Sequence, residues 1–335
     1  MYVETVFGSR LYVLGLDKPE RAEGVQWTTF VIDESSDQRP GVFDKSILPA
    51  LSHHCEWCAR IGVPKRSGPG AVEFRRAWDE GLNEDDASSL SLMWPSSDIV
   101  DPSVIEDARK RLDPQTFDEQ YNASWLTLGG GVYYCYDDEH NVSEACIYRP
   151  NVPIVVGCDF NVDPMSWVLA HFIDGHLFVF DEIYHRDTNT RKTLAHLKKK
   201  YGSHQAGWLF TGDASGRARK TSADVSDYAQ IQSFEGLKNK RVIFPRSNPS
   251  IATRVMTMNS AFLNTNEERR LFFNPRLKHL RGDTGQLVYK PKTREIDTSS
   301  NMGHLTDSLG YLVMHFLPIK LSTRKSLVTS RIHTA

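Results

Sequence analysis

The second half of the chain alternates short apolar runs with polar turns in a regular order. Apolar runs of strand length predict strands, and stretches with apolar positions three or four apart predict helices. In chain order the pattern predicts strands over 152–158, 166–173 and 176–183, a helix over 188–201, a strand over 207–211, a helix near 221–234, a strand over 241–244, and helices over 249–263 and 304–317. We therefore expect an α/β domain with a mixed sheet in the order βββαβαβα.

The first half alternates similar elements and reads as a second α/β layer. The pattern predicts strands over 4–7, 11–14, 28–32, 58–63 and 91–94, and helices over 72–80, 102–112 and 114–126. A glycine run and an Asp-rich stretch then break all periodicity. We therefore divide the chain into a domain over 1–128, a linker over 129–150, a domain over 151–320 and a tail over 321–335.

Two apolar strands of the second domain each end on an aspartate. Asp159 follows the run over 152–158, and Asp213 follows the run that begins at Trp208. A carboxylate at the end of a buried strand lies where the sheet opens to solvent, and adjacent parallel strands would bring both acids together. The third strand carries Asp181 and Glu182, and only one of these can face the same site. A single strand-end aspartate is often a turn former, so only the combination is informative.

The last predicted helix brings two more polar residues to the region. Leu305, Leu309 and Leu312 form an apolar stripe, while His304 and Asp307 lie three positions apart on a neighbouring face. Clustered carboxylates repel one another unless a hard cation such as Mg²⁺ or Mn²⁺ neutralises them. Two such ions about 4 Å apart stabilise the attacking and leaving oxygens in phosphodiester hydrolysis. The acids therefore predict a metal-dependent hydrolase of nucleic acid.

Two other motifs carry less chemistry. Asp163 stands before Pro164, and because Asp-Pro is a common turn pair it is expected as an accessory at most. Cys55 and Cys58 have the spacing of a zinc-binding pair with histidines beside them, but no second pair lies at zinc-finger spacing downstream. The five scattered cysteines instead favour reduced thiols.

Length and charge set broad limits. A chain of 335 residues can bury two modest cores. The net charge of -2 neither supports nor excludes a nucleic-acid partner. The N-terminus lacks a basic stretch followed by an apolar run, and no segment approaches the roughly 18 apolar residues that span a bilayer. We therefore expect a cytoplasmic protein without a membrane partner.

Four motifs of the second domain resemble the nuclease domain of tailed-phage terminase large subunits, which has an RNase H-like fold. They are Val-Gly-Cys-Asp-Phe-Asn-Val-Asp-Pro-Met at 156–165, Phe-Asp-Glu-Ile-Tyr at 180–184, Gly-Asp-Ala-Ser at 212–215 and His-Leu-Thr-Asp-Ser-Leu-Gly-Tyr at 304–311. The resemblance implies that Asp159, Asp213 and Asp307 are catalytic and bind Mg²⁺ or Mn²⁺. It also implies that Glu182 and His304 are further catalytic residues.

The first domain resembles the end of the terminase ATPase domain. The strand that ends at Asp33-Glu34 is similar to a Walker B strand, in which Asp33 would hold magnesium through water and Glu34 would orient the attacking water. A P-loop requires Gly-Lys-Ser/Thr, yet none of the 22 glycines is followed by lysine. The Walker A part is thus missing, and Met1 looks like an internal start or the edge of a truncated gene. We expect ATP as a ligand only if that part is supplied elsewhere.

Basic residues near the acids are candidates for binding phosphates of double-stranded DNA. One cluster follows Asp213 and the other lies on a predicted hairpin over 286–296, although such runs are often only solvated surface. The six candidates are Arg217, Arg219, Lys220, Lys290, Lys292 and Arg294. Because no helix-turn-helix or zinc-finger spacing is present, we expect low sequence preference.

The expected function is the metal-dependent DNA endonuclease of a phage packaging terminase, which cuts concatemeric double-stranded DNA. The resemblance implies the terminase small subunit and the portal protein as partners and the host cytoplasm as location. Two alternatives stay open. One is another RNase H-like nuclease of the resolvase or transposase type, and the other is a truncated, non-enzymatic DNA-binding or assembly remnant.

Overall fold

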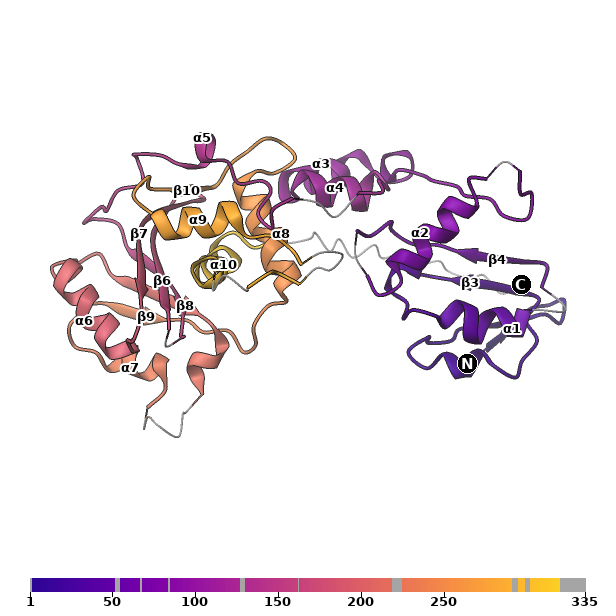
Figure 1. Ribbon diagram of the computed structural model, residues 1–335, viewed down its shortest axis with the longest axis horizontal. Coiled ribbons are helices and arrows are strands. Elements are labelled where there is room, and N and C mark those ends of the chain that lie inside the picture. The colour runs from indigo at the N-terminus through magenta and orange to yellow at the C-terminus, as the bar shows by residue number, and fades with distance from the viewer. Residues whose placement is uncertain are drawn as a thin grey trace, which may run out of the picture. The chain divides into compact units, whose positions relative to one another are not determined.

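The computed structural model describes residues 2–51, 55–66, 68–83, 85–126, 130–161, 163–218, 225–290, 295–298 and 302–319. The chain divides into two compact units (Figure 1). The first includes Met1–Ile105 and Gln115–Gly129, and the second includes Glu106–Pro114, Gly130–Lys290 and Glu295–Ala335. No helix in these described ranges is both long and apolar enough to cross a membrane.

The second unit is built on a six-stranded mixed sheet with the strand order β10-β7-β6-β5-β8-β9. Its strands are β5 (Ile154–Asp159), β6 (Met165–Ile173), β7 (His176–His185), β8 (Trp208–Gly212), β9 (Lys240–Val242) and β10 (Leu271–Phe273). β5, β6 and β7 form an antiparallel meander, while β8 is parallel to β5, β9 to β8 and β10 to β7. This mixed architecture confirms the predicted α/β fold class.

Helices pack on both faces of this sheet (Figure 1). They are α5 (Asp138–Asn141), α6 (Thr190–Tyr201), α7 (Asp227–Ser233), α8 (Ile251–Phe262), α9 (Lys278–Gln286) and α10 (His304–Phe316), with a 3-10 turn η5 (Ala214–Arg217). The side chains of Asn189, Ser226 and Ser250 cap α6, α7 and α8 by accepting a backbone N–H three residues on. The helix starts are thus encoded locally.

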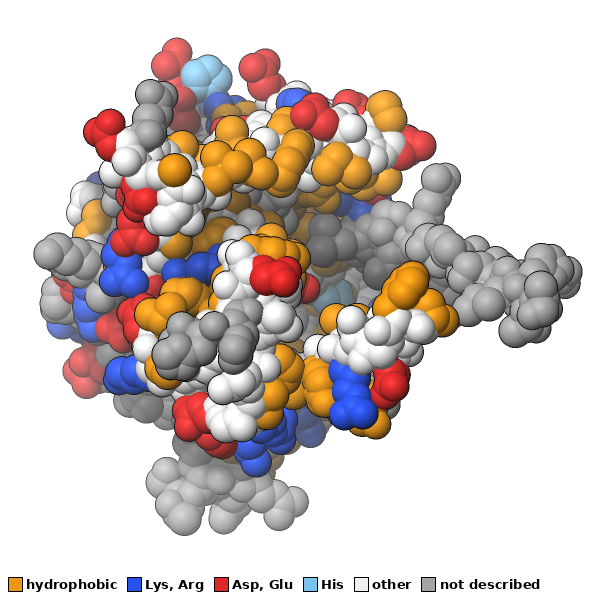
Figure 2. All heavy atoms as spheres, turned by 90° about the vertical axis from the view of Figure 1, so that its right-hand side faces the viewer, with side chains coloured by type: hydrophobic (Ala, Val, Ile, Leu, Met, Phe, Trp, Pro, Cys, Tyr) orange, Lys and Arg blue, Asp and Glu red, His pale blue; other side chains and the backbone are white. Residues whose placement is uncertain are grey.

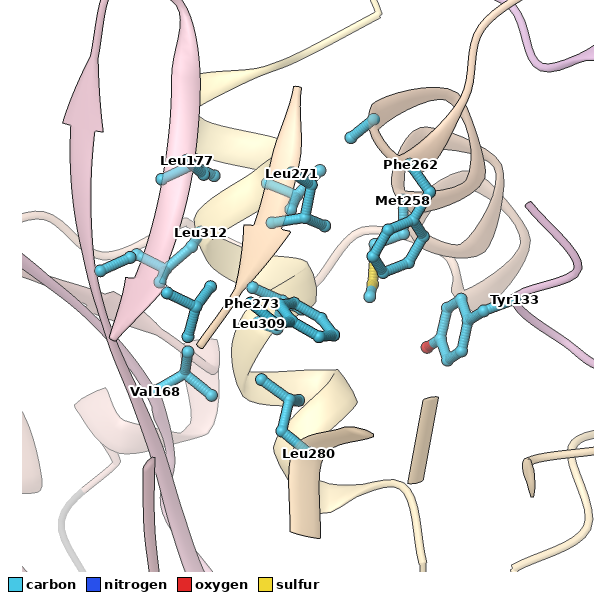
Figure 3. Packing of buried hydrophobic residues seen from close by; sticks show 14 of the residues in the cluster. Tyr133, Val168, Leu177, Met258, Phe262, Leu271, Phe273, Leu280, Leu309 and Leu312 are labelled. Atoms are coloured by element: carbon cyan, nitrogen blue, oxygen red, sulfur yellow. The ribbon is translucent and has the colours of Figure 1, made fainter. Parts of the chain in front are cut away.

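β5 separates two hydrophobic cores. Val156 belongs to the core that includes α6 and α7, whereas Val155 belongs to the core that includes α8, α9 and α10. Figure 3 shows the second core, in which Leu309 and Leu312 of α10 lie among side chains of the strands and of α8. Because successive residues of a strand face opposite sides, Asp159 faces the side of α10. The last helix and the end of β5 therefore meet at one place.

The apolar pattern missed β10 and α9. β10 has only three residues, and α9 carries Gly282 and Gly285, so neither shows a clear period. Residues expected in a linker over 129–150 add Val132, Tyr133 and Cys135 to the core, and this stretch includes α5. The arms of the predicted hairpin over 286–296 pair through an antiparallel bridge between its Tyr and Ile. The division into domains stays a prediction.

The first unit has a small core and short elements. They are β1 (Tyr2–Glu4), β2 (Arg10–Tyr12), η1 (Pro19–Ala22), β3 (Thr29–Ile32), η2 (Ser35–Asp37), the π-helix η3 (Phe43–Ile47), α1 (Leu48–Leu51), β4 (Trp57–Arg60), α2 (Ala71–Glu80) and η4 (Ser96–Asp98), followed at the boundary by α3 (Pro102–Arg111) and α4 (Pro114–Tyr121). β1 and β2 are antiparallel, and β3 and β4 are parallel. The helix predicted over 114–126 corresponds to α4, which ends at Tyr121, five residues before the predicted end.

Many large hydrophobic side chains of this unit are exposed. Val6 and Phe7 are 95% and 92% exposed, and orange patches are visible on the face of the molecule in Figure 2. The strand predicted over 91–94 is wrong, because this stretch is irregular and its Leu92, Met93 and Trp94 are exposed rather than packed in a sheet. An apolar run alone did not distinguish a buried strand from an exposed loop.

Candidate active site

Asp159 and Asp213 lie at the ends of two adjacent parallel strands. Asp159 is the last residue of β5, and Asp213 directly follows β8. Cys158 is the register partner of Gly212, and its carbonyl accepts the backbone N–H of Asp213 at 3.1 Å. A Cβ atom at Gly212 would lie 2.1 Å from that carbonyl oxygen, so the close approach requires glycine. The structure thus brings these two predicted acids to one edge of the sheet.

Asp307 reaches the same edge through the first turn of α10. The helix lies directly against β5, because a Cβ atom at Gly157 would be 2.2 Å from the carbonyl oxygen of Ser308. The hydroxyl of Ser308 donates to the carbonyl of Gly157 at 2.8 Å and fixes this contact. Asp307 precedes Ser308 in the chain, and Asp159 lies two residues beyond Gly157. The third predicted acid therefore joins the first two.

His304 and Asn161 contact the carboxylate of Asp159, which is 6% exposed. His304 Nδ1 lies 3.1 Å from Oδ2 of Asp159, and Asn161 donates to the same oxygen at 3.0 Å. The carboxylate raises the pKa of His304 above its ordinary value by accepting this hydrogen bond. Sequence reasoning predicted His304 but missed Asn161. Its position two residues after Asp159 was the available signal.

The three carboxylates are close enough to influence one another. Burial raises the pKa of Asp307 to about 6, and the charges of Asp159 and Asp213 raise it as well, whereas Arg254 lowers it. Arg254 donates from Nη2 to Oδ1 of Asp307 at 2.5 Å. The site is therefore a cluster of acids that is partly neutralised by one buried arginine and one histidine.

Asn248 orients Asp213. Its amide donates to Oδ1 of Asp213 at 2.8 Å, and its own oxygen accepts the backbone N–H of Ala214 at 2.8 Å. The same Oδ1 of Asp213 accepts the backbone N–H of Ser215 at 2.7 Å. Asn248 lies in a loop distant in sequence, and no local pattern marks it.

Glu182 lies on the same face of the sheet as Asp159, but its carboxylate accepts hydrogen bonds from a helix rather than contacting the acids. Its Oε1 and Oε2 accept the backbone N–H groups of His279 and Leu280 at 3.0 and 2.7 Å, at the start of α9. Burial raises the pKa of Glu182. Its neighbour Asp181 points to the other side, where it accepts hydrogen bonds from Lys200 and Tyr201. The catalytic role expected for Glu182 stays a prediction.

α9 connects Glu182 to the start of α10. Asp283 of α9 is 9% exposed, and its Oδ2 accepts the backbone N–H of Gly303 at 3.1 Å. Gly303 directly precedes His304. His279 of α9 stacks on Tyr184 of β7, with ring centroids 4.6 Å apart. Sequence reasoning missed Asp283, since the pattern did not reveal the helix that carries it.

The donor set suits a hard divalent cation. Among the described residues no three His, Cys, Asp or Glu side chains converge closely enough to hold a metal ion on their own. Three aspartates nevertheless supply anionic oxygens, and Mg²⁺ and Mn²⁺ take such ligands together with several waters. The buried hydroxyl of Ser166, opposite Asp159 in the sheet, has no hydrogen-bond partner in the described chain. A polar atom of this kind fits contact with a water ligand.

The predicted DNA-binding residues are only partly described. Arg217 is exposed at the end of η5, the turn that follows Asp213, and its guanidinium lies 5.2 Å from the centre of the Phe244 ring. Lys290 is exposed and forms an ion pair with Glu295 at 2.9 Å. The other four, Arg219, Lys220, Lys292 and Arg294, lie outside the described residues. A phosphate role for these side chains stays a prediction.

The residues predicted to be Walker B acids lie in the first unit. Asp33 and Glu34 are exposed directly after β3, and Lys65 pairs with Glu34 at 3.8 Å.

In the same unit, burial and the neighbouring Cys55 raise the pKa of Cys58 to about 11, so its thiol stays protonated at neutral pH. The histidines at 53 and 54 lie outside the described part of the chain.

Solved structures with a similar fold include large terminases. The large terminase from a thermophilic bacteriophage aligns with 92% of this chain and 74% of its own, at 15% identity and a TM-score of 0.59. The same protein in complex with ADP aligns with 90% of this chain and 72% of its own, at 16% identity and a TM-score of 0.58. No protein-family model and no curated protein sequence matches the chain. The resemblance seen in the motifs is thus confirmed at the level of the fold.

Proposed function

We propose that the chain belongs to the phage terminase large subunits and that its second unit is a divalent-metal-dependent endonuclease for double-stranded DNA. The observation that carries the proposal is the meeting of Asp159, Asp213 and Asp307 at one sheet edge. These residues come from β5, from the end of β8 and from α10, and the fold is shared with a large terminase. A sheet edge with three electrostatically coupled carboxylates suits phosphodiester hydrolysis.

Asp159, Asp213 and Asp307 would hold Mg²⁺ or Mn²⁺, with two ions as the preferred number. When bound, such ions make water a stronger nucleophile and stabilise the leaving oxygen. Asn161 and His304 hold the carboxylate of Asp159 in one orientation. The raised pKa of His304 favours its cationic form, which offsets part of the negative charge.

DNA would be held through its phosphates. Arg217 is exposed four residues after Asp213, at the end of η5, and its guanidinium is supported by the ring of Phe244. The further proposed phosphate contacts are Arg219, Lys220, Lys290, Lys292 and Arg294. Contacts to phosphates carry no sequence information directly, so cleavage should show low sequence preference.

The first unit is proposed to be the C-terminal part of a P-loop ATPase-type domain. Asp33 and Glu34 directly follow β3, as expected for Walker B acids. Without a Gly-Lys-Ser/Thr sequence, we expect no ATP hydrolysis by this chain alone. DNA-stimulated ATP turnover in the purified protein that is abolished by Glu34→Gln would contradict this expectation.

The proposed partners are double-stranded DNA, the terminase small subunit and the portal protein, and the proposed location is the host cytoplasm. These assignments rest on the fold shared with a phage large terminase. Co-purification of this chain with the two proteins from infected cells would test them.

Plasmid cleavage tests the nuclease proposal most directly. Purified protein is incubated with supercoiled plasmid and Mn²⁺, Mg²⁺ or EDTA, and nicked and linear products are quantified. We expect cleavage with metal only and a loss of at least about a hundredfold in Asp159→Asn. Asp174→Asn, which removes an exposed carboxylate from the β6–β7 turn, is the matched control and should cleave normally. Uncut plasmid under all metals, with retarded plasmid in a gel, would favour the non-enzymatic DNA-binding alternative.

A further inference from the structure

Arg254 of α8 is a buried cation beside the acids. The residue is 4% exposed, and its Nη2 donates to Oδ1 of Asp307 at 2.5 Å. Its guanidinium also lies 5.2 Å from the ring centre of Tyr311, and its Nε has no hydrogen-bond partner in the described part of the chain. A buried charge is costly unless it is paired, so this arginine depends on Asp307 as its counter-ion.

Gly310 provides the path by which Arg254 reaches Asp307. A Cβ atom at this position in α10 would lie 2.4 Å from Cδ and 2.6 Å from Cγ of Arg254. Glycine inside a helix is destabilising relative to alanine. Here its missing side chain allows the arginine stem to cross the helix towards the acids. Two helices distant in sequence are thus shaped for this one contact.

We propose that Arg254 is a positioning residue of the nuclease site. It holds one oxygen of Asp307 in place and leaves the other available to a divalent cation, which Asp159, Asp213 and Asp307 would hold. Its fixed charge also opposes the binding of cations, since it reduces the charge of three carboxylates from -3 to -2. The inference rests on the proposed nuclease function, and it adds a residue that selects the geometry and limits the metal affinity of the site.

The test separates metal affinity from the cleavage rate. Arg254→Gln removes the charge, Arg254→Lys keeps it, and Arg270→Gln removes a partly buried arginine whose Nε also lacks a described partner. Mn²⁺ binding to DNA-free protein is measured by calorimetry, cleavage is measured at saturating Mn²⁺, and thermal melting checks folding. We expect Arg254→Gln to bind Mn²⁺ about tenfold more tightly, because a nearby repelling charge is gone. Its cleavage rate should fall about a hundredfold, because Asp307 is no longer held.

Arg254→Lys should bind Mn²⁺ with nearly the wild-type affinity and recover part of the rate, while Arg270→Gln should match the wild type in both. Cleavage by Arg254→Gln within about threefold of wild type would overturn the proposal, as would weaker Mn²⁺ binding. If Arg254→Gln does not fold, the cleavage rate and Mn²⁺ affinity of Arg254→Lys test the positioning role instead. A tenfold lower rate at unchanged affinity supports positioning, and a wild-type rate overturns it. A wild-type protein that neither binds Mn²⁺ nor cuts would instead refute the nuclease function itself.

Discussion

The contact between Gly157 and Ser308 makes the placement of Asp307 sensitive to a single methyl group. In Gly157→Ala the new Cβ would lie 2.2 Å from the carbonyl oxygen of Ser308 and 3.0 Å from Cγ of Leu312. The closest ordinary carbon–oxygen contacts are about 3.3 Å long, so α10 must move away from β5 by roughly 1 Å. Overpacking of this kind costs about 1–3 kcal/mol. A displacement of about 1 Å at a catalytic group can lower the rate about a hundredfold.

Two measurements check this reasoning. Thermal unfolding should show a melting temperature lowered by roughly 4–8 °C for a cost of about 2 kcal/mol, and plasmid cleavage with Mn²⁺ should fall by about a hundredfold among molecules that are still folded. Gly282→Ala is the matched control, because a Cβ there meets nothing within 4 Å, and it should be neutral or slightly stabilising. A folded Gly157→Ala protein with normal cleavage would refute the idea that this contact positions Asp307.

Three further predictions concern side chains around the site and the core. Glu182→Ala should lower the free energy of unfolding by about 1–3 kcal/mol, because two N–H groups of α9 lose their acceptors. Glu182→Gln keeps one acceptor and should cleave plasmid at a rate within about tenfold of wild type. A hundredfold loss of the cleavage rate in a stable Glu182→Gln protein would instead favour a catalytic role for Glu182. Arg217→Ala should weaken DNA binding and reduce the slope of log affinity against log salt by about 1, as measured by fluorescence anisotropy, and an unchanged slope would exclude a phosphate contact. Burial lowers the pKa of His171, so the folded state favours its neutral form. The free energy of unfolding should therefore decline as the pH falls below about 6.5, by at most about 1.4 kcal/mol per pH unit. Urea titrations at several pH values should show a smaller slope in His171→Gln. A pH dependence unchanged in that variant would assign the effect to other groups.

The acids could be predicted because local signals placed them. Asp159 and Asp213 each follow an apolar run, and Asp307 lies in the first turn of a helix with a regular apolar stripe. These patterns depend only on neighbours in the chain, and the parallel pairing of β5 with β8 then brings the two strand ends together.

The supporting residues could not be predicted in the same way. Arg254, Asn248 and Asp283 act through contacts to residues 20 to 53 positions away in the chain. Each lies in a loop or helix with no pattern that points to an acid elsewhere. β10 and α9 were missed for a related reason, since a three-residue strand and a polar helix are defined by their packing partners rather than by their own period.

The position of Asp307 in the last described helix has a consequence for how the protein is made. Asp159 and Asp213 lie on and directly after the paired strands β5 and β8, but the third acid is translated 94 residues after Asp213 and is placed only when α10 docks on β5. The helix that completes the site also supplies Leu309 and Leu312 to the core. A nascent or unfinished chain would therefore lack both the closed core and the complete set of three acids, so the proposed nuclease activity is expected only in the completed fold.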